Sequence, residues 1–223
     1  MGNKRFGNCF SLLIFVPMRK MLLLGVSLLL TACTRGRLQE GDLIFQANDP
    51  GGFTGAIENV TGGNWSHVGI IDVRPEGVSV LEATTERGVV RTSLEDFLAS
   101  SAHDAQGRPL VKVFRLSDPD AARLGRAAVR RAETWLGRPY DFAFAEGMEA
   151  VYCSELVHAC FLQDDGTPVF TARPMTFKDP EGITDPYWTE YYARLGVPIP
   201  EGVPGTNPND LSREPVLREI SVF

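Results

Sequence analysis

The chain has 223 residues, of which 43% are hydrophobic and 22% are charged. This length and composition fit one folded domain with its own core rather than a disordered or fibrous protein. Four basic and no acidic residues precede Cys33, so the remainder carries 18 basic and 28 acidic side chains, a formal charge of −10. An acidic chain of this kind gains nothing from counterion release at a phosphate backbone, which argues against a nucleic-acid partner.

Residues 1–33 have the pattern of a targeting segment. A basic start at Met18–Lys20 is followed by the apolar run Met21–Leu30, and small residues end the segment at Leu30-Thr31-Ala32-Cys33. The run is too short to span a bilayer comfortably. The last four residues resemble the bacterial lipobox, which implies cleavage before Cys33 and attachment of lipid to its sulfur. A plain secretory signal or a short membrane anchor is the alternative.

The residue after the lipobox cysteine bears on the destination of the protein. An aspartate there retains a lipoprotein at the inner membrane, whereas this chain has Thr34. We therefore expect a lipid-anchored protein of the bacterial cell envelope, on the outer membrane and facing the periplasm. The leader leaves two candidate starts for the chain, Met1 and Met18.

Residues 34–40 are expected to be a tether and residues 41–223 a single domain. In that domain, runs of apolar and β-branched residues are bounded by glycine, proline, asparagine and aspartate, which predicts strands. The predicted strands are Gly41–Phe45, Ser66–Asp72, Val78–Ala83, Gly88–Thr92 and Leu110–Leu116.

The turn between the second and third strands decides whether His67 and Glu82 share a face of the sheet. A loop of two residues (Pro75 and Glu76) or of four (Arg74–Gly77) pairs residues whose numbers sum to 151. Either loop makes His67 and Glu82 diagonal neighbours on one face. A three-residue loop would break that parity. The alternative for Glu82 is a solvated strand residue.

Two helices are expected before the central motif of the chain. Ser93 caps a short helix that ends at Leu98. Asp118-Pro119 provides an N-cap and a first-turn proline for a longer amphipathic helix, which Gly137 closes. After Phe161 the chain is rich in proline and aromatic residues, and we expect these segments to wrap around the domain.

The third helix begins at a cysteine. One apolar helical face is formed by Cys153, Leu156, Val157, Cys160 and Phe161. At the first turn of a helix, the free N–H groups and the positive end of the dipole favour a thiolate, which makes Cys153 a candidate nucleophile. The alternative is that Cys153 is simply a small buried hydrophobic residue.

The remaining cysteines and histidines are weaker candidates for a site. The four cysteines of the chain match no metal-ligand or disulfide spacing, and Cys153 and Cys160 lie two helical turns apart, so both should be free thiols. Of these two, we expect Cys153 to be the more reactive. His158 is rotated by about 140° from Cys153 along the helix and is therefore not its base. His103 lies in a polar loop and should be exposed to solvent.

Several stretches together resemble the circularly permuted papain-fold hydrolases of the NlpC superfamily, the YiiX-like group. They are Gly41–Phe45, Ser66–Ile70, Leu81–Ala83, Trp135–Asp141, Tyr152–Val157 and Gly205–Leu211. In unpermuted relatives the cysteine helix precedes the histidine strand, whereas here His67 comes first. The resemblance implies an α+β fold in which a small antiparallel sheet packs against helices.

The resemblance also implies roles for individual residues. The nucleophile, base and orienting carboxylate of the family map onto Cys153, His67 and Glu82, and Tyr152 matches a residue at the oxyanion site. Neither a metal nor an organic cofactor is implied. Glu155 stands where unpermuted members that cleave peptidoglycan carry glycine, and this makes a cell-wall peptidase assignment less secure.

These residues predict an envelope-associated cysteine hydrolase of the amidase or peptidase type. Its substrate would be an amide or ester bond of a peptide, a peptidoglycan fragment or an acylated lipid. One alternative is an acyltransferase or acyl hydrolase that acts on membrane lipids. Another is a catalytically idle lipoprotein that uses its groove only for binding. The sequence leaves the substrate and the oligomeric state open.

Overall fold

The computed structural model describes residues 37–220 except Glu146 and Met148, together with Val222 and Phe223. The predicted leader with its lipobox, and the first part of the predicted tether, lie outside the described residues. Residues from Arg37 onward form one compact unit. Leu38, in the last part of the predicted tether, packs against the core of this unit.

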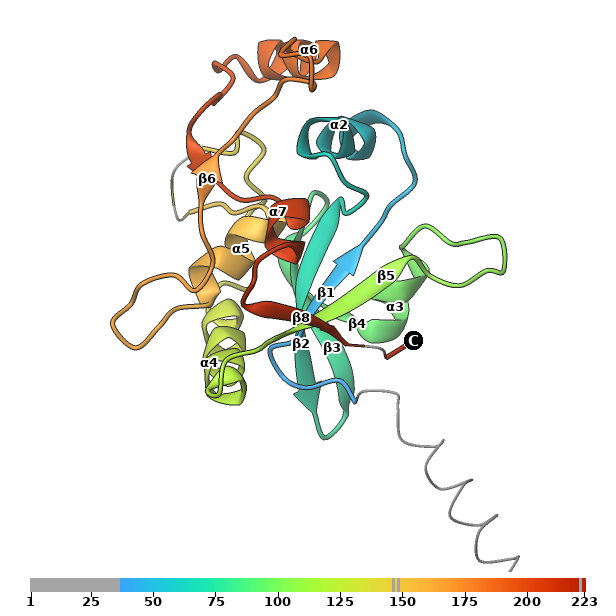
Figure 1. Ribbon diagram of the computed structural model, residues 1–223, viewed down its shortest axis with the longest axis vertical. Coiled ribbons are helices and arrows are strands. Elements are labelled where there is room, and N and C mark those ends of the chain that lie inside the picture. Colours follow the sequence, from blue (N-terminus) through green and yellow to red (C-terminus); the bar gives the residue numbers. More distant parts are fainter. Residues whose placement is uncertain (1–36, 146, 148, 221) are drawn as a thin grey trace, which may run out of the picture. The chain divides into compact units, whose positions relative to one another are not determined.

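Six antiparallel strands form the central sheet, in the order β4-β3-β2-β1-β5-β8 (Figure 1). Their bounds are β1 (Leu43–Gln46), β2 (His67–Arg74), β3 (Gly77–Thr84), β4 (Gly88–Ser93), β5 (Val111–Leu116) and β8 (Leu217–Ile220). The first five overlap the predicted strands, whereas β8 was not predicted. An antiparallel sheet packed against helices confirms the predicted α+β class.

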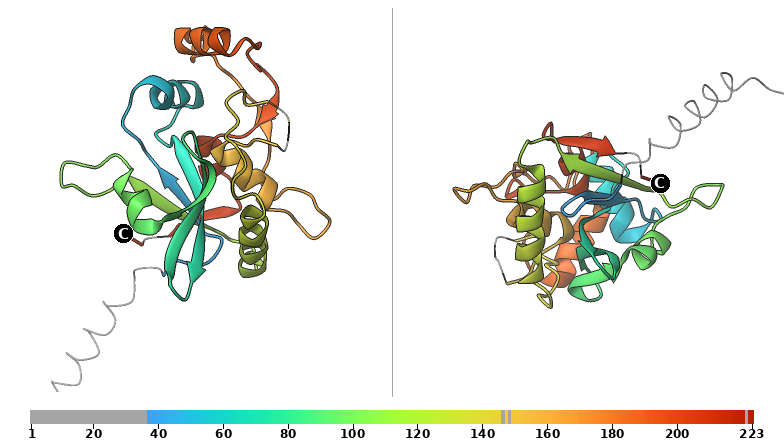
Figure 2. Two further views of the ribbon diagram at one scale, coloured as in Figure 1. Left: turned by 180° about the vertical axis from the view of Figure 1, so that it is seen from behind. Right: turned by 90° about the horizontal axis from the view of Figure 1, so that it is seen from below.

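The side chains of the strands alternate between two layers. On one face, Phe45 and Ile70 pack in a cluster with α4 (Ala121–Glu133) and α5 (Cys153–Cys160). On the other face, Ile71 and Val80 pack with Phe97 of α3 (Leu94–Ala99). Figures 1 and 2 show α4 and α5 on one side of the sheet and α3 on the other.

The hairpin of β2 and β3 has the predicted parity. Arg74 pairs with Gly77, so the loop consists of Pro75 and Glu76, and paired residues sum to 151. Beyond the pair Ile70–Leu81, Gly69 approaches β3 closely, because an added Cβ would lie 2.3 Å from Val80 Cγ1. The absence of a side chain at Gly69 therefore lets the two strands come together.

The predicted helix caps are confirmed for α3 and need correction for α4. The Ser93 hydroxyl accepts a hydrogen bond from the backbone N–H of Asp96 at 3.0 Å. The α4 helix begins at Ala121 after Asp120, and the N-cap predicted at Asp118-Pro119 is wrong. Asp118 instead accepts the backbone N–H of Asp120 at 2.6 Å, which forms a separate turn before the helix.

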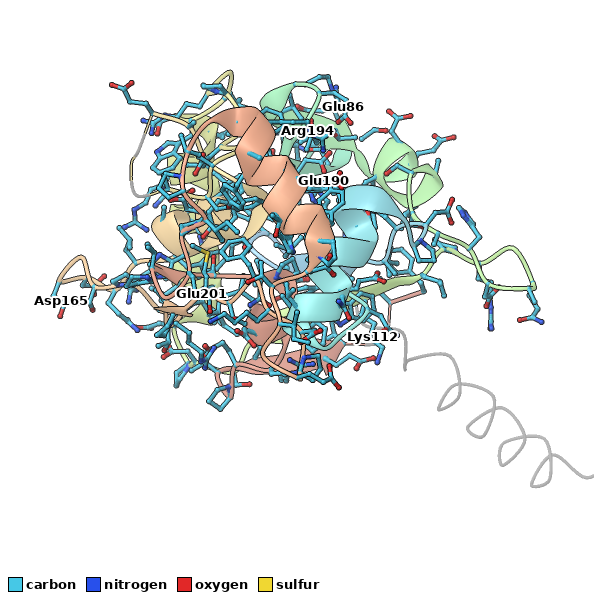
Figure 3. The ribbon with its side chains drawn as sticks, turned by 90° about the horizontal axis from the view of Figure 1, so that it is seen from above. Glu86, Lys112, Asp165, Glu190, Arg194 and Glu201 are labelled. Atoms are coloured by element: carbon cyan, nitrogen blue, oxygen red, sulfur yellow. The ribbon has the colours of Figure 1, made fainter. Side chains whose placement is uncertain are left out.

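Three helices were not predicted: α2 (Gly52–Thr61), α6 (Pro186–Leu195) and α7 (Pro208–Ser212). The α2 segment contains glycine and β-branched residues with low helix propensity, so its stability comes from packing. Ala56 of α2 lies in an aromatic cluster with Phe177 and with Trp188 and Tyr192 of α6. Glu190 and Arg194 of α6 are exposed (Figure 3). A small second sheet pairs β6 (Arg173–Pro174) with β7 (Pro204–Gly205).

Candidate active site

His67 and Glu82 form a close pair across the β2–β3 hairpin. Nε2 of His67 lies 2.6 Å from Oε2 of Glu82, and the exposed fractions of the two side chains are 14% and 5%. The ring of Phe97 packs against His67 with 5.8 Å between ring centroids. Glu82 is therefore buried and paired, so the alternative of a solvated strand residue is wrong.

Cys153 is the first residue of α5, as predicted, and its side chain is buried. His67 begins β2, and the Cys153 sulfur lies near enough to its ring to influence the pKa of His67. Burial alone would lower the pKa of His67, but the hydrogen bonds to Cys153 and Glu82 outweigh burial and raise that pKa to about 10. The geometry therefore favours an imidazolium beside the sulfur at neutral pH.

Tyr152 precedes Cys153 and caps α5. Its hydroxyl oxygen accepts the backbone N–H of Thr206 at 3.1 Å, which leaves the O–H hydrogen as a donor. Burial raises the pKa of Tyr152 to about 12, so the phenol stays protonated at neutral pH. Because Tyr152 and Cys153 line the same cavity, this donor belongs to the site.

Two cavities flank the Cys153–His67 pair. A cavity of about 260 Å³ adjoins Cys153, and its apolar and aromatic walls include Phe144, Met175, Phe177 and Trp188. A cavity of about 590 Å³ adjoins His67 and Glu82, with Arg87 among the polar residues that line it. The two cavities adjoin each other, because Ile57, Ser66 and Tyr140 line both.

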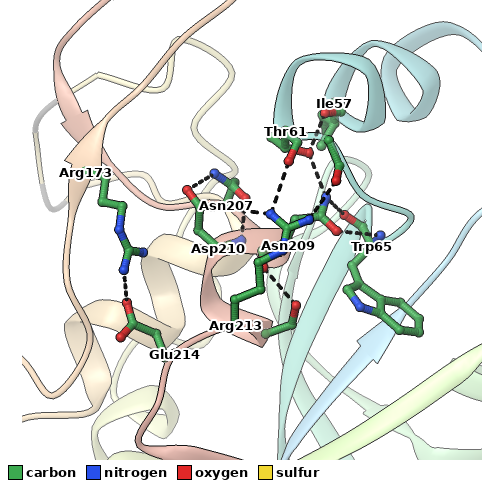
Figure 4. A network of polar contacts seen from close by, with 11 residues as sticks. Ile57, Thr61, Trp65, Arg173, Asn207, Asn209, Asp210, Arg213 and Glu214 are labelled. Carbon is green, nitrogen blue, oxygen red and sulfur yellow. Dashed lines mark hydrogen bonds and ion pairs between the residues drawn. The ribbon is translucent and has the colours of Figure 1, made fainter. Parts of the chain in front are cut away.

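Sequence reasoning missed Asn209, a buried residue of α7 that holds the chain just before His67. Asn209 Oδ1 accepts the N–H of Trp65 at 3.0 Å, and Nδ2 donates to the carbonyl of Trp65 at 2.9 Å (Figure 4). Nδ2 also donates to the hydroxyl of Thr61 at 2.6 Å. Gly63 leaves room for this contact, because an added Cβ would lie 2.2 Å from Asn209 Oδ1.

Further polar contacts fix α7 and the residues around it. Arg213 donates to the carbonyl of Gly62 at 2.6 Å, and the guanidinium of Arg173 lies 3.0 Å from the carboxylate of the buried Glu214 (Figure 4). Together with the bond from Thr206 to Tyr152, these contacts join the histidine side of the site to the cysteine side. Asn209 lies in Gly205–Leu211, one of the stretches that carry the family resemblance, but no local pattern predicts its bonds to a distant backbone.

The comparison with protein families is consistent with this geometry. Residues 37–221 match the model of the permuted papain-like amidase enzymes, the YaeF/YiiX or C92 family. The chain belongs to this family. The predicted YiiX-like, permuted papain resemblance is thereby confirmed.

The chain is also similar to two individual proteins. The uncharacterized protein YiiX of Escherichia coli K12 is 32% identical over 120 residues, which are 53% of this chain and 55% of YiiX, so the match spans about half of each protein. The crystal structure of metalloprotein YiiX from Escherichia coli O157:H7 superposes with a TM-score of 0.67 at 24% identity. It covers 83% of this chain and 97% of that one, and it supports the fold.

That crystal structure is described as a metalloprotein. In the described part of the present C92 chain, no group of three or more histidine, cysteine, aspartate or glutamate side chains could hold a metal ion.

Three other residues considered in the sequence analysis, His103, His158 and Glu155, are not part of the His67–Glu82 pair. His103 is exposed, as predicted, and burial lowers the pKa of the half-buried His158. Glu155 accepts the N–H of Tyr152 at 3.4 Å, and burial raises its pKa to about 8. In this C92 chain, the side chain that replaces glycine thus caps the cysteine helix.

We expect alkylation at pH 7.5 to label Cys153 and spare Cys160. Both are free thiols. Burial raises the pKa of Cys160 to about 12, so roughly one in 10⁴ or fewer of its thiols is ionised at that pH. Brief treatment with iodoacetamide followed by peptide mapping measures this, with Cys153→Ala as the control. Equal labelling, or preferential labelling of Cys160, would contradict the assignment of Cys153 as nucleophile.

Proposed function

We propose that this C92 family member hydrolyses amide bonds with Cys153 as nucleophile, His67 as base and acid, and Glu82 as the orienting carboxylate. The observation that carries the proposal is the 2.6 Å pair of His67 and Glu82 beside a sulfur at the start of a helix. Nucleophile, base and orienter in hydrogen-bonding contact are what acyl transfer requires.

In the acylation step, the Cys153 thiolate attacks the carbonyl carbon and forms a C–S bond while the carbonyl oxygen becomes an oxyanion. The backbone N–H of Cys153 and the hydroxyl of Tyr152 donate to this oxyanion. His67 passes its proton to the leaving nitrogen as the C–N bond breaks, and the amine departs. The products are a free amine and a thioester on Cys153.

In the second step, the now neutral His67 accepts a proton from water as the water oxygen attacks the thioester carbon. The C–S bond breaks, a carboxylic acid is released, and the Cys153 thiolate forms again beside the imidazolium. Glu82 accepts the ring N–H throughout, so it orients His67 and stabilises its positive charge.

The apolar cavity beside Cys153 favours a substrate with an apolar part next to the scissile bond. This supports a second candidate from the same chemistry, an acyl hydrolase or acyltransferase that acts on acylated lipids. A transferase would pass the acyl group from Cys153 to an amine or alcohol in place of water. The third candidate is a protein that binds a ligand in its groove without catalysing a reaction.

Incubation with peptides, peptidoglycan fragments and acylated lipids, followed by mass spectrometry, separates these functions. A hydrolase releases free acid and amine, a transferase makes a new amide or ester, and an idle protein returns its ligand unchanged. Acid quenching should trap an acyl group on the peptide that contains Cys153. If turnover occurs with no acyl adduct on Cys153 and does not depend on Cys153, the covalent mechanism is rejected.

We propose further that Cys33 carries lipid and anchors the domain in the cell envelope, with the outer membrane as its destination. Among the described residues, no helix is long and apolar enough to span a bilayer. A diacylglycerol supplies two chains, whereas a single acyl chain binds only marginally. We therefore expect the wild-type protein to fractionate with membranes and Cys33→Ala to escape normal processing. An unmodified Cys33 in the mature protein, measured by intact mass, would reject the anchor.

A further inference from the structure

Both oxygens of the Glu82 carboxylate are held. Oε2 faces His67, and Oε1 accepts a hydrogen bond from the hydroxyl of Thr92 on β4. Thr92 is buried, with 9% of its surface exposed. The two strands that neighbour β3, β2 and β4, thus each provide one hydrogen-bond partner for the carboxylate. The carboxylate cannot rotate without breaking one of these bonds.

Sheet register explains why Thr92 reaches Glu82. Glu82 pairs with Val90 on β4, and Val80 pairs with Thr92. Because side chains alternate along a strand, Thr92 lies on the same face as Glu82 and diagonal to it. His67 of β2 contacts the same carboxylate from the other side of β3. Glu82 therefore has a partner on each of the two neighbouring strands.

The proton of the Thr92 hydroxyl has a defined direction. Thr92 Oγ1 accepts a hydrogen bond from Nη2 of Arg87 at 3.2 Å, so its own hydrogen points to Glu82. Burial would raise the pKa of Glu82, but the bonds from His67 and Thr92 and the charge of Arg87 lower it. Arg87 is exposed and lines the polar cavity beside His67.

We propose that Thr92 is a positioning residue of the site, which fixes the Glu82 carboxylate so that Oε2 meets His67, with Arg87 directing the Thr92 hydroxyl. This inference rests on the proposed function of the Cys153, His67 and Glu82 group. The chain of contacts then runs from a surface arginine to the sulfur: Arg87, Thr92, Glu82, His67 and Cys153.

If Thr92 had only a structural role, its hydroxyl would do no more than donate a hydrogen bond to a buried carboxylate. Loss of that hydroxyl would then lower the stability of the domain and have no other effect. The pKa of His67 separates the two roles, because it depends on how well the carboxylate faces the ring. The groups that face His67 are Glu82 of β3, the Cys153 sulfur of α5 and the uncharged ring of Phe97 from α3.

The test is an NMR titration of the full chain with isotope-labelled histidine, in which His67→Ala identifies the His67 signal. Thr92→Val keeps the shape of the side chain and removes the hydroxyl. We expect it to lower the pKa of His67 by about one unit and kcat/KM by about tenfold, the scale of one hydrogen bond to a charged group. Thr92→Ser should keep the wild-type pKa, and Arg87→Gln should give a smaller shift.

The control is Thr134→Val, which removes an exposed hydroxyl that donates to the carbonyl of Arg131. It should leave the pKa of His67 and the activity unchanged. An unchanged or higher pKa of His67 in a folded Thr92→Val variant would overturn the proposal, as would an equal shift in Thr92→Ser. The titration needs no substrate, so it remains informative even if Cys153→Ala retains activity and the proposed function fails.

Discussion

Replacing Cys153 with alanine should lower the rate of hydrolysis by at least about 10⁴-fold while the domain stays folded. Alanine offers no nucleophile, and loss of a nucleophile in a comparable catalytic unit costs about 10⁶ in kcat. The change removes only one sulfur atom from a mostly apolar site, so stability should change little. Steady-state kinetics and a thermal melt measure the two effects.

The matched control for Cys153→Ala is Cys160→Ala, the same substitution on the same helix. Cys160 is fully buried and outside both cavities that flank the site, so we expect lower stability with near wild-type turnover. His67→Ala should be as inactive as Cys153→Ala, and the double variant should lose little more, because the members of one catalytic unit are not additive. Activity that survives in Cys153→Ala and disappears in Cys160→Ala would contradict the assignment.

Replacing Glu82 with glutamine should lower turnover by about 10² to 10⁴-fold and change the pH profile. His67 must be protonated to release the leaving amine, so activity is lost as the pH rises through its pKa, about 10. Glutamine keeps the shape and removes the negative charge that favours the imidazolium. The pKa of His67 should therefore fall, and the alkaline limb of kcat/KM should move to lower pH.

The measurement is kcat/KM from pH 5 to 11, with Glu76→Gln as the control. Glu76 is an exposed residue in the turn of the same hairpin, so its profile should match the wild type. Two results would exclude Glu82 from the catalytic group and leave a dyad of Cys153 and His67. One is full activity in Glu82→Gln, and the other is a double variant in which the losses of activity from Glu82→Gln and His67→Ala simply add as free energies.

The parts of the site that could be predicted depend on local periodicity. The two-residue turn at Pro75 and Glu76 determines the parity of the hairpin, so His67 and Glu82 could be placed on one face. The helical pattern after Tyr152 placed Cys153 in the first turn of α5. Thr92 could have been found by the same arithmetic, if the register of β4 against β3 had been known.

The parts that could not be predicted depend on contacts between distant segments. The sequence pattern around α2 and α6 is weak, and both helices are stabilised by a shared aromatic cluster. Asn209 and Trp65 are 144 residues apart, and no local rule pairs an asparagine with a distant backbone. The start of α4 was misplaced because an Asp-Pro pair serves a turn as well as a helix cap.

The contacts that join α7 and its neighbouring residues to both sides of the site also bear on when the site can form during synthesis. A ribosome completes His67 and Cys153 before Thr206 and Asn209, so the hydrogen bonds from these two residues to the Tyr152 hydroxyl and the Trp65 backbone can form only late in synthesis. A partly synthesised chain therefore carries a cysteine without an aligned partner. The order of synthesis therefore puts the completion of the proposed site after residues 206–209, the last of its parts to be made.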